Sequence, residues 1–190
     1  MLLLLLTGPP GAGKSTVATV VHDWLGDNGV ANALVEADEL RRCYPALTGH
    51  RLRLHVSFMV RSYQEAGHDL LILTETLEDP ADVEQIVAAA GPDRVFLVRL
   101  DAEPETVQAR IRAREPATWS GLPELLASAA HLAASMRLLP HVDLVVSTQA
   151  GPLRMWLLSS WLPSIPGEGR TDDVESSVLD GYGTGYSSLS

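Results

Sequence analysis

The chain has 190 residues, 46% of them hydrophobic, and a formal net charge of -10. This length and composition fit one globular domain with a sizeable core, and the negative charge argues against a general binder of nucleic acids or anionic membranes. With one cysteine and no apolar run near the ~18 residues that span a bilayer, the sequence excludes an intrachain disulfide, indicates a cytoplasmic location and predicts no membrane helix.

The first element is a run of five leucines, Leu2–Leu6. A secretion signal would need a basic start, an apolar core of ~7–15 residues and a small-residue cleavage site, and the run has none of these. A continuous apolar run of this length is typical of a strand buried on both faces in a parallel sheet. We therefore expect the leucines to form a central strand.

Strand-like and helix-like segments alternate after this run, which predicts an α/β fold in three layers, with a five-stranded parallel sheet between helices. The expected strands are Leu2–Leu6, Ala31–Glu36, Asp69–Thr74, Arg94–Leu100 and Val142–Ser147. The expected helices are Lys14–Asn28, Asp38–Tyr44, Arg51–Ala66, Asp82–Ala90, Pro104–Arg114, Leu122–Leu139 and Leu153–Leu162.

The composition changes after residue 162. Residues 163–190 are rich in Gly and Ser and carry five acids against one arginine. We expect residues 1–162 to form the folded domain and 163–190 to form a flexible acidic tail. A few apolar and tyrosine side chains leave a docking role for the tail open.

The segment "GPPGAGKST" matches the phosphate-binding pattern G-x-x-x-x-G-K-[ST] and lies between a predicted strand and a predicted helix. Glycines let successive N–H groups curl toward phosphate oxygens, the helix adds its positive end, Lys14 reaches the β- and γ-phosphates, and Ser15 offers a hydroxyl to Mg²⁺. The donor is therefore expected to be a nucleoside triphosphate bound with Mg²⁺. The predicted binding residues are Gly8, Gly11, Ala12, Gly13, Lys14, Ser15 and Thr16.

Lys14 is the only lysine in the chain. A guanine-selecting Asn-Lys-x-Asp motif is therefore absent, which excludes an ordinary GTPase. Large mechanical ATPases normally exceed this length and end a long apolar strand in adjacent acids, whereas Leu70–Leu73 ends in Thr74 and Glu75.

Three segments, "LLLTGPPGAGKST", "VEADELRR" and "VRLDAEPETVQARIRARE", resemble the small adenylate-kinase-like P-loop kinases and the AAA_33 ATPases. The resemblance covers about residues 1–162 and implies transfer of the γ-phosphoryl group of ATP to a hydroxyl of a small acceptor. It implies that Asp38, just past the second strand, faces that hydroxyl, with Glu36 and Glu39 as nearby alternatives. The other interpretation of Asp38 is a helix cap, since Asp is favoured there.

The resemblance also places Arg110 and Arg114 at the start of a lid, where one arginine packs on adenine and another contacts phosphates. The two lie on one helix face at i, i+4, and guanidinium groups suit phosphate. A solvated face paired with nearby glutamates is the alternative. The lid itself, Glu115–Gly121, is short, and Trp119 could close over a ligand or anchor packing. By analogy of fold alone, the segment 147–151 would lie near the adenine edge.

The acceptor is expected between the second and third strands, where 41–61 holds five arginines, two histidines and no acid. Such a local excess of positive charge would attract an anionic acceptor, although exposed arginines at a subunit contact are equally consistent with it. The predicted acceptor-binding residues are Asp38, Arg41, Arg42, Arg53 and Glu75.

The sequence thus predicts a small-molecule kinase in which Lys14, Asp38, Arg110 and Arg114 act in catalysis. The alternative is a nucleotide-dependent ATPase or switch that acts on a protein partner through the acidic tail. The sequence leaves open the acceptor's identity, the choice between Asp38 and Glu75 as the essential carboxylate, and the oligomeric state, a homodimer included.

Overall fold

The computed structural model describes residues 1–149 of the chain. They form one five-stranded sheet in the order β2-β3-β1-β4-β5, and every neighbouring pair of strands is parallel. The strands are β1 (Leu2–Thr7), β2 (Asn32–Glu36), β3 (Leu70–Thr74), β4 (Arg94–Asp101) and β5 (Leu144–Ser147). The predicted parallel sheet is confirmed, and the leucine run is its central strand. The helix expected at Leu153–Leu162 and the tail at 163–190 lie outside the described residues.

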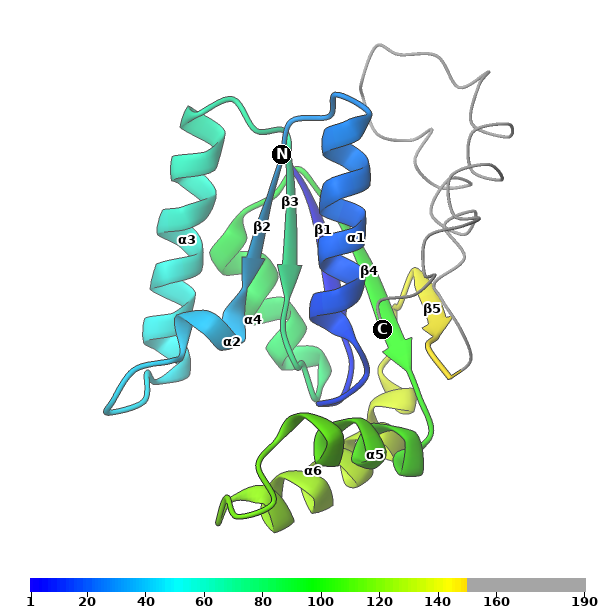
Figure 1. Cartoon of the computed structure of the whole chain (residues 1–190). Helices are drawn as coiled ribbons and strands as arrows, with labels where there is room; N and C mark the ends of the chain where they lie inside the picture. Colours follow the sequence, from blue (N-terminus) through cyan, green and yellow to red (C-terminus); the bar gives the residue numbers. More distant parts are fainter. Residues whose placement is uncertain (150–190) are drawn as a thin grey trace, which may run out of the picture. The chain divides into compact units, whose positions relative to one another are not determined.

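Helices cover both faces of this sheet (Figure 1). They are α1 (Lys14–Asp27), α2 (Ala37–Leu40), α3 (Gly49–Glu65), α4 (Pro80–Ala90), α5 (Pro104–Arg114) and α6 (Leu122–Ser135), followed by a 3-10 turn, η1 (Met136–Leu138). Helix α1 packs against β2 and β3, and α3 packs against α4. The three-layer α/β/α architecture is therefore confirmed. Within 1–149, no helix is long and apolar enough to cross a membrane.

The alternation of side chains along the strands divides the core into two layers. Leu3 and Leu5 of β1 pack with Val56 of α3 and Ile86 of α4 in one buried cluster. Neighbouring leucines along β1 point to the opposite face, where α1 lies. Because both faces of β1 are covered, every residue of this strand is buried, which explains why the leucine run does not alternate with polar residues.

Two predicted helices end earlier than the sequence indicated. The helix expected to reach Tyr44 ends at Leu40 and gives way to a loop that contains Pro45. The helix expected to reach Leu139 ends at Ser135 and tightens into η1, and Leu139 is extended because Pro140 disfavours helical geometry in the preceding residue.

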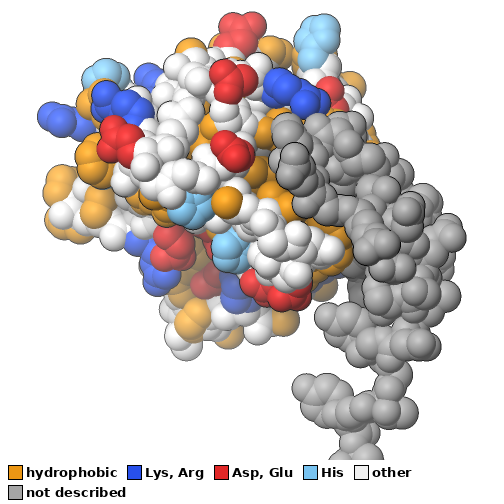
Figure 2. Space-filling view, turned by 90° about the horizontal axis from the view of Figure 1, so that it is seen from above, with side chains coloured by type: hydrophobic (Ala, Val, Ile, Leu, Met, Phe, Trp, Pro, Cys, Tyr) orange, Lys and Arg blue, Asp and Glu red, His pale blue; other side chains and the backbone are white. Residues whose placement is uncertain are grey.

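The carboxyl ends of all the strands face one side of the molecule, and α5 and α6 lie across that side (Figure 1). Ligands of open α/β sheets bind at this edge. Figure 2 shows the opposite side, over the amino ends of the strands, where acidic, basic and histidine side chains are interspersed.

Candidate functional site

The loop between β1 and α1 follows a path that only glycine permits at two positions. Gly8 has φ 153°, and a Cβ there would lie 2.6 Å from the carbonyl oxygen of Leu100 in β4. Gly11 has φ 81°, and its Cβ would lie 2.7 Å from the carbonyl oxygen of Val107 in α5. Both distances are too short for a real Cβ, so the loop packs directly on β4 and α5.

Helix α1 begins at Lys14 without a side-chain cap, and Gly13 precedes it in a left-handed conformation. The first N–H groups of a helix have no partner within the helix, and they carry its positive dipole end. Together with the curled loop, this uncapped end forms a cradle for an anion such as phosphate.

The ammonium of Lys14 is buried within this loop. It donates hydrogen bonds to the carbonyl oxygen of Gly8 at 2.8 Å and to Thr76 Oγ1 at 2.9 Å, with a longer contact of 3.4 Å to the carbonyl oxygen of Pro9. Burial lowers the pKa of Lys14, while the negative charges of Asp38 and Glu75 act in the opposite direction. The lysine is thus held at the loop with two carboxylates close enough to act on it.

Ser15 Oγ donates a hydrogen bond to Glu36 Oε2 at the end of β2. Hydroxyl and carboxylate oxygens are what Mg²⁺ prefers, and this ion usually keeps several waters rather than a full protein cage. Ser15 and Glu36 therefore fit an ion that takes its other ligands from phosphate and water. Within residues 1–149, no group of three or more His, Cys, Asp or Glu side chains could hold a metal ion. The sequence named Glu36 only as an alternative to Asp38. In the structure Glu36 instead accepts a hydrogen bond from the Ser15 hydroxyl.

Glu75, directly after β3, is the most buried carboxylate of the site, with 1% of its side chain exposed. Its Oε1 accepts hydrogen bonds from Arg41 NH1 at 2.6 Å and from the backbone N–H of Thr76 at 2.9 Å. Its Oε2 is buried and has no hydrogen-bond partner among residues 1–149. Burial raises the pKa of Glu75, and the adjacent Arg41 guanidinium reduces that shift.

Asp38 lies in α2 and is 68% exposed. Its Oδ1 is 3.9 Å from Arg41 NH1, so Arg41 stands between the exposed Asp38 and the buried Glu75. The residue at the cap position of α2 is Glu36, and no side chain caps this helix. The interpretation of Asp38 as a helix cap is therefore wrong, because the helix begins at Ala37, two residues earlier than that interpretation requires.

A cavity of about 280 Å³ opens beside Glu75 between α3 and α4. Of the predicted acceptor-binding residues, Arg41, Arg53 and Glu75 line it, and Asp38 and Arg42 do not. Its wall also carries two acids, Glu78 and Asp82, which were not among the predicted acceptor-binding residues because they follow β3 rather than lying in the arginine-rich segment. Arg42 is exposed and pairs with Glu39 at 3.0 Å.

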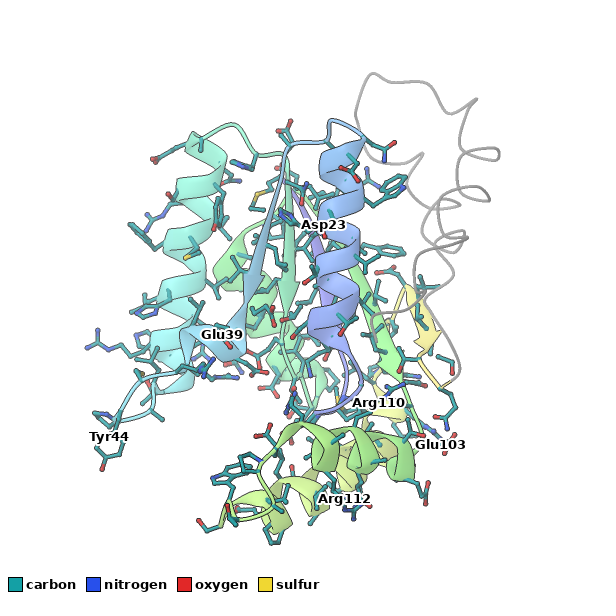
Figure 3. The ribbon with its side chains drawn as sticks, in the orientation of Figure 1. Asp23, Glu39, Tyr44, Glu103, Arg110 and Arg112 are labelled. Carbon is teal, nitrogen blue, oxygen red and sulfur yellow. The ribbon has the colours of Figure 1, made fainter. Side chains whose placement is uncertain are left out.

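Helix α5 brings the two predicted arginines to the loop in different ways. Arg110 points toward the sheet edge, whereas Arg112 lies on the other side of the helix (Figure 3). The guanidinium of Arg110 donates to the backbone carbonyl of Gly11 at 3.3 Å and to Thr148 Oγ1 at 3.2 Å. Arg114 is 63% exposed, and its Nε donates to Glu115 Oε1 at 2.7 Å.

Thr148, which follows β5, contacts the phosphate-binding loop, and the sequence did not identify this role. Its hydroxyl donates a hydrogen bond to the carbonyl oxygen of Ala12 at 2.9 Å, and its backbone N–H donates one to the carbonyl oxygen of Asp101. Only a position near the adenine edge had been expected for this segment. The signal was weak because a threonine after a short strand has no recognisable motif.

The short connection expected as a lid joins α5 to α6 through Glu115–Gly121. Trp119 is partly exposed there, and its ring packs so closely on Gly121 that a Cβ would lie 2.6 Å from Trp119 Cζ2. The packing interpretation of Trp119 agrees with this contact.

Comparisons with known proteins give a family match and several structural neighbours. The family model AAA_33, described as an AAA domain, matches residues 3–138. No curated protein matches the chain. Among solved structures, the one named as the crystal structure of APE1195 aligns with a TM-score of 0.62 at 19% identity, covering 87% of this chain and 96% of that chain.

Two further structures have printed names that state an activity. A sugar kinase from Janibacter sp. HTCC2649 aligns with a TM-score of 0.57 at 21% identity, covering 85% of this chain and 92% of its own. A gluconokinase from Sinorhizobium meliloti 1021 aligns with a TM-score of 0.53 at 16% identity, covering 78% and 83%. At these identities the likeness establishes the fold, and the family match spans most of the chain. The chain therefore belongs to the AAA_33 family and has the fold of the small P-loop kinases.

Proposed function

We propose that the chain is an ATP- and Mg²⁺-dependent kinase that transfers the γ-phosphoryl group to a hydroxyl of a small acceptor. The observation that carries this proposal is the arrangement around Lys14: its ammonium lies at the uncapped start of α1, within electrostatic reach of the exposed Asp38. Phosphoryl transfer needs aligned reactants and neutralised charge more than covalent chemistry, and this arrangement serves both. We place the activity in the cytoplasm, which suits an exposed, unpaired Cys43.

On the donor side, the loop N–H groups and Lys14 bind the phosphates of ATP. Ser15 would hold Mg²⁺, and Glu36, already bonded to the Ser15 hydroxyl, would orient water around it. When bound, the ion neutralises charge on the phosphate oxygens. Arg114 adds a positive charge near the phosphates, because it is exposed yet close enough to lower the pKa of Lys14. Arg110 is bonded to loop backbone instead, so we assign it to holding the nucleotide loop in shape.

On the acceptor side, we assign the base to Asp38 rather than to Glu75. A base must come within hydrogen-bond reach of the acceptor hydroxyl. Asp38 is exposed, whereas Oε1 of Glu75 is bonded to Arg41 and Oε2 is buried. Glu75 instead fixes Arg41, whose guanidinium also approaches Asp38. Asp38 thus orients the hydroxyl and accepts its proton late in the transfer.

The cavity beside Glu75 suggests the kind of acceptor. Arg53 lines it and has no ion pair with any residue in 1–149, so an anionic group is a suitable partner. Glu78 and Asp82 on the same wall are acceptors for hydroxyl groups. We therefore propose an anionic acceptor with several hydroxyls, such as a sugar acid.

A screen with labelled ATP and Mg²⁺ over sugar acids, other sugars, nucleosides and nucleotides tests this function. Wild-type protein is expected to label an acceptor, and Asp38→Asn to lower kcat by about 10²–10⁴-fold, the usual contribution of acid–base catalysis. Asp23→Asn is the matched control, because Asp23 is exposed on the distant part of α1 (Figure 3) and should leave the rate unchanged.

Two results would contradict the proposal. If Asp38→Asn labelled its acceptor at the wild-type rate, the assignment of the base would be wrong. If no acceptor were labelled while a protein partner stimulated ATP turnover, the chain would be a nucleotide-dependent switch instead.

A further inference from the structure

The hydrogen bonds of Lys14 leave one of its three donors available. An ammonium carries three N–H groups. Two of them have acceptors at good distances, the carbonyl oxygen of Gly8 at 2.8 Å and Thr76 Oγ1 at 2.9 Å. The contact to the carbonyl oxygen of Pro9, at 3.4 Å, is longer than an ordinary N–H···O bond. Two bonds therefore fix the ammonium, and the third donor can turn to a phosphate oxygen.

Of the two fixing partners, only Thr76 lies outside the phosphate-binding loop. Its backbone N–H donates to Glu75 Oε1 at 2.9 Å, and the same oxygen accepts the 2.6 Å bond from Arg41. Arg41, Glu75 and Thr76 all line the cavity beside β3. Thr76 thus links the two sites, because its backbone N–H bonds to Glu75 on the cavity wall and its hydroxyl accepts a bond from the ammonium of Lys14.

We propose that Thr76 is a positioning residue for Lys14: its hydroxyl holds the ammonium in the orientation that phosphoryl transfer needs and connects it to the wall of the acceptor cavity. This proposal rests on the proposed kinase function. The hydroxyl suits the role because it accepts a bond from a cation without adding a charge of its own. An apolar side chain here would leave a donor of a buried ammonium without its partner, which is costly.

Replacement of Thr76 by valine keeps the shape of the side chain and removes the hydroxyl. A hydrogen bond to a charged group contributes enough that its loss should lower kcat by about 10- to 100-fold. The KM for ATP should change by less than about 3-fold, because Lys14 keeps its charge and position in the loop and loses only alignment in the transition state. Thr76→Ser restores the hydroxyl and should restore kcat to within about 3-fold of wild type.

A second measurement needs no acceptor. Because Lys14 is the only lysine in the chain, protein labelled with ¹⁵N-lysine gives a single side-chain ammonium signal in NMR. In wild-type protein without nucleotide, a buried and hydrogen-bonded ammonium should exchange slowly with water and give a visible signal. We expect Thr76→Val to weaken or abolish that signal and Thr76→Ser to keep it.

Thr106→Val is the matched control, since the hydroxyl of Thr106 on α5 accepts a hydrogen bond from Gln149 Nε2 at 2.7 Å and does not contact Lys14. It should leave kcat and the ammonium signal unchanged. A thermal melt checks that each variant is folded, and Thr76→Ala replaces Thr76→Val if the valine does not fit.

The outcomes separate the two proposals. A folded Thr76→Val protein with wild-type kcat and a wild-type ammonium signal overturns the positioning role. If wild-type protein labels no acceptor, the kinase function fails, and the ammonium signal of the variants still decides whether Thr76 holds Lys14. A loss of kcat in Thr76→Ser equal to that in Thr76→Val also overturns the proposal, because the hydroxyl would then be irrelevant.

Discussion

The pair formed by Arg41 and Glu75 gives a prediction about stability that does not depend on knowing the acceptor. Glu75 is 1% exposed, and Arg41 supplies its only ion-pair partner within residues 1–149, at 2.6 Å. Arg41→Met keeps most of the aliphatic stem and removes the charge. The buried carboxylate must then either stay charged without a partner or take up a proton, and both cost stability at neutral pH.

The size of the stability loss in Arg41→Met, and its dependence on pH, follow from how deeply Arg41 and Glu75 are buried. Breaking a buried ion pair by removing one partner costs about 3–5 kcal/mol. Arg41 is 39% exposed, so water screens the pair, and we expect a loss of about 2 kcal/mol at pH 8.

Burial raises the pKa of Glu75, and removal of Arg41 raises it further. An acid whose pKa is higher in the folded state than in the unfolded state contributes stability that is fully present below its unfolded pKa. That stability is lost as the pH rises through its folded pKa. The variant should therefore lose about 0.5 kcal/mol or less at pH 5, where Glu75 binds a proton more readily.

Urea denaturation of wild type and variant at pH 5 and pH 8 measures this difference. The double variant Arg41→Met, Glu75→Gln removes the charge that lost its partner, and it should recover most of the stability at pH 8. Arg42→Met is the matched control, because Arg42 pairs with Glu39 at the surface and should cost less than about 0.5 kcal/mol at either pH. Equal destabilisation at both pH values, or no recovery in the double variant, would refute the reasoning.

Two further predictions concern the phosphate-binding loop. Gly11→Ala should destabilise the protein by about 2–4 kcal/mol in thermal denaturation, because its Cβ meets the Val107 carbonyl at 2.7 Å in addition to the strain of φ 81°. Gly29→Ala should cost only about 1 kcal/mol, since φ is 72° there and nothing lies within 4 Å; equal losses at both sites would argue against the contact. Thr148→Val should weaken ATP binding by about 3- to 10-fold in calorimetry, as the bond to the Ala12 carbonyl is lost, and unchanged affinity would show that β5 does not hold the loop.

The fold could be predicted from the sequence because its signals are local. The leucine run, the glycine-rich loop and the strand–helix alternation each span a few residues, and together they specified the parallel sheet that the structure contains. The early end of α2 at Leu40 and the tightening of α6 after Ser135 were missed, since helix ends depend on the loops and prolines that follow.

The site was only partly predictable, because its decisive contacts join distant segments. Lys14 and Ser15 were identified by a motif, whereas their partners come from elsewhere in the chain: Thr76 follows β3, and Glu36 ends β2. No spacing rule connects a threonine after β3 with a lysine sixty-two positions earlier. The acids of the cavity were missed for the same reason.

The contrast between Asp38 and Glu75 shows why the essential carboxylate could not be chosen from residue type. Both follow a strand at the same edge of the sheet, and both approach the guanidinium of Arg41, at 3.9 Å and 2.6 Å. Burial separates them: water solvates Asp38, which keeps it accessible to an acceptor, whereas Glu75 has a raised pKa and its near oxygen occupied. A carboxylate with these bonds is suited to hold Arg41 and Thr76 in place, and a carboxylate exposed beside the same arginine is suited to receive a proton. The arginine therefore links the two roles, because any movement that releases it from Glu75 also changes the charge that Asp38 experiences.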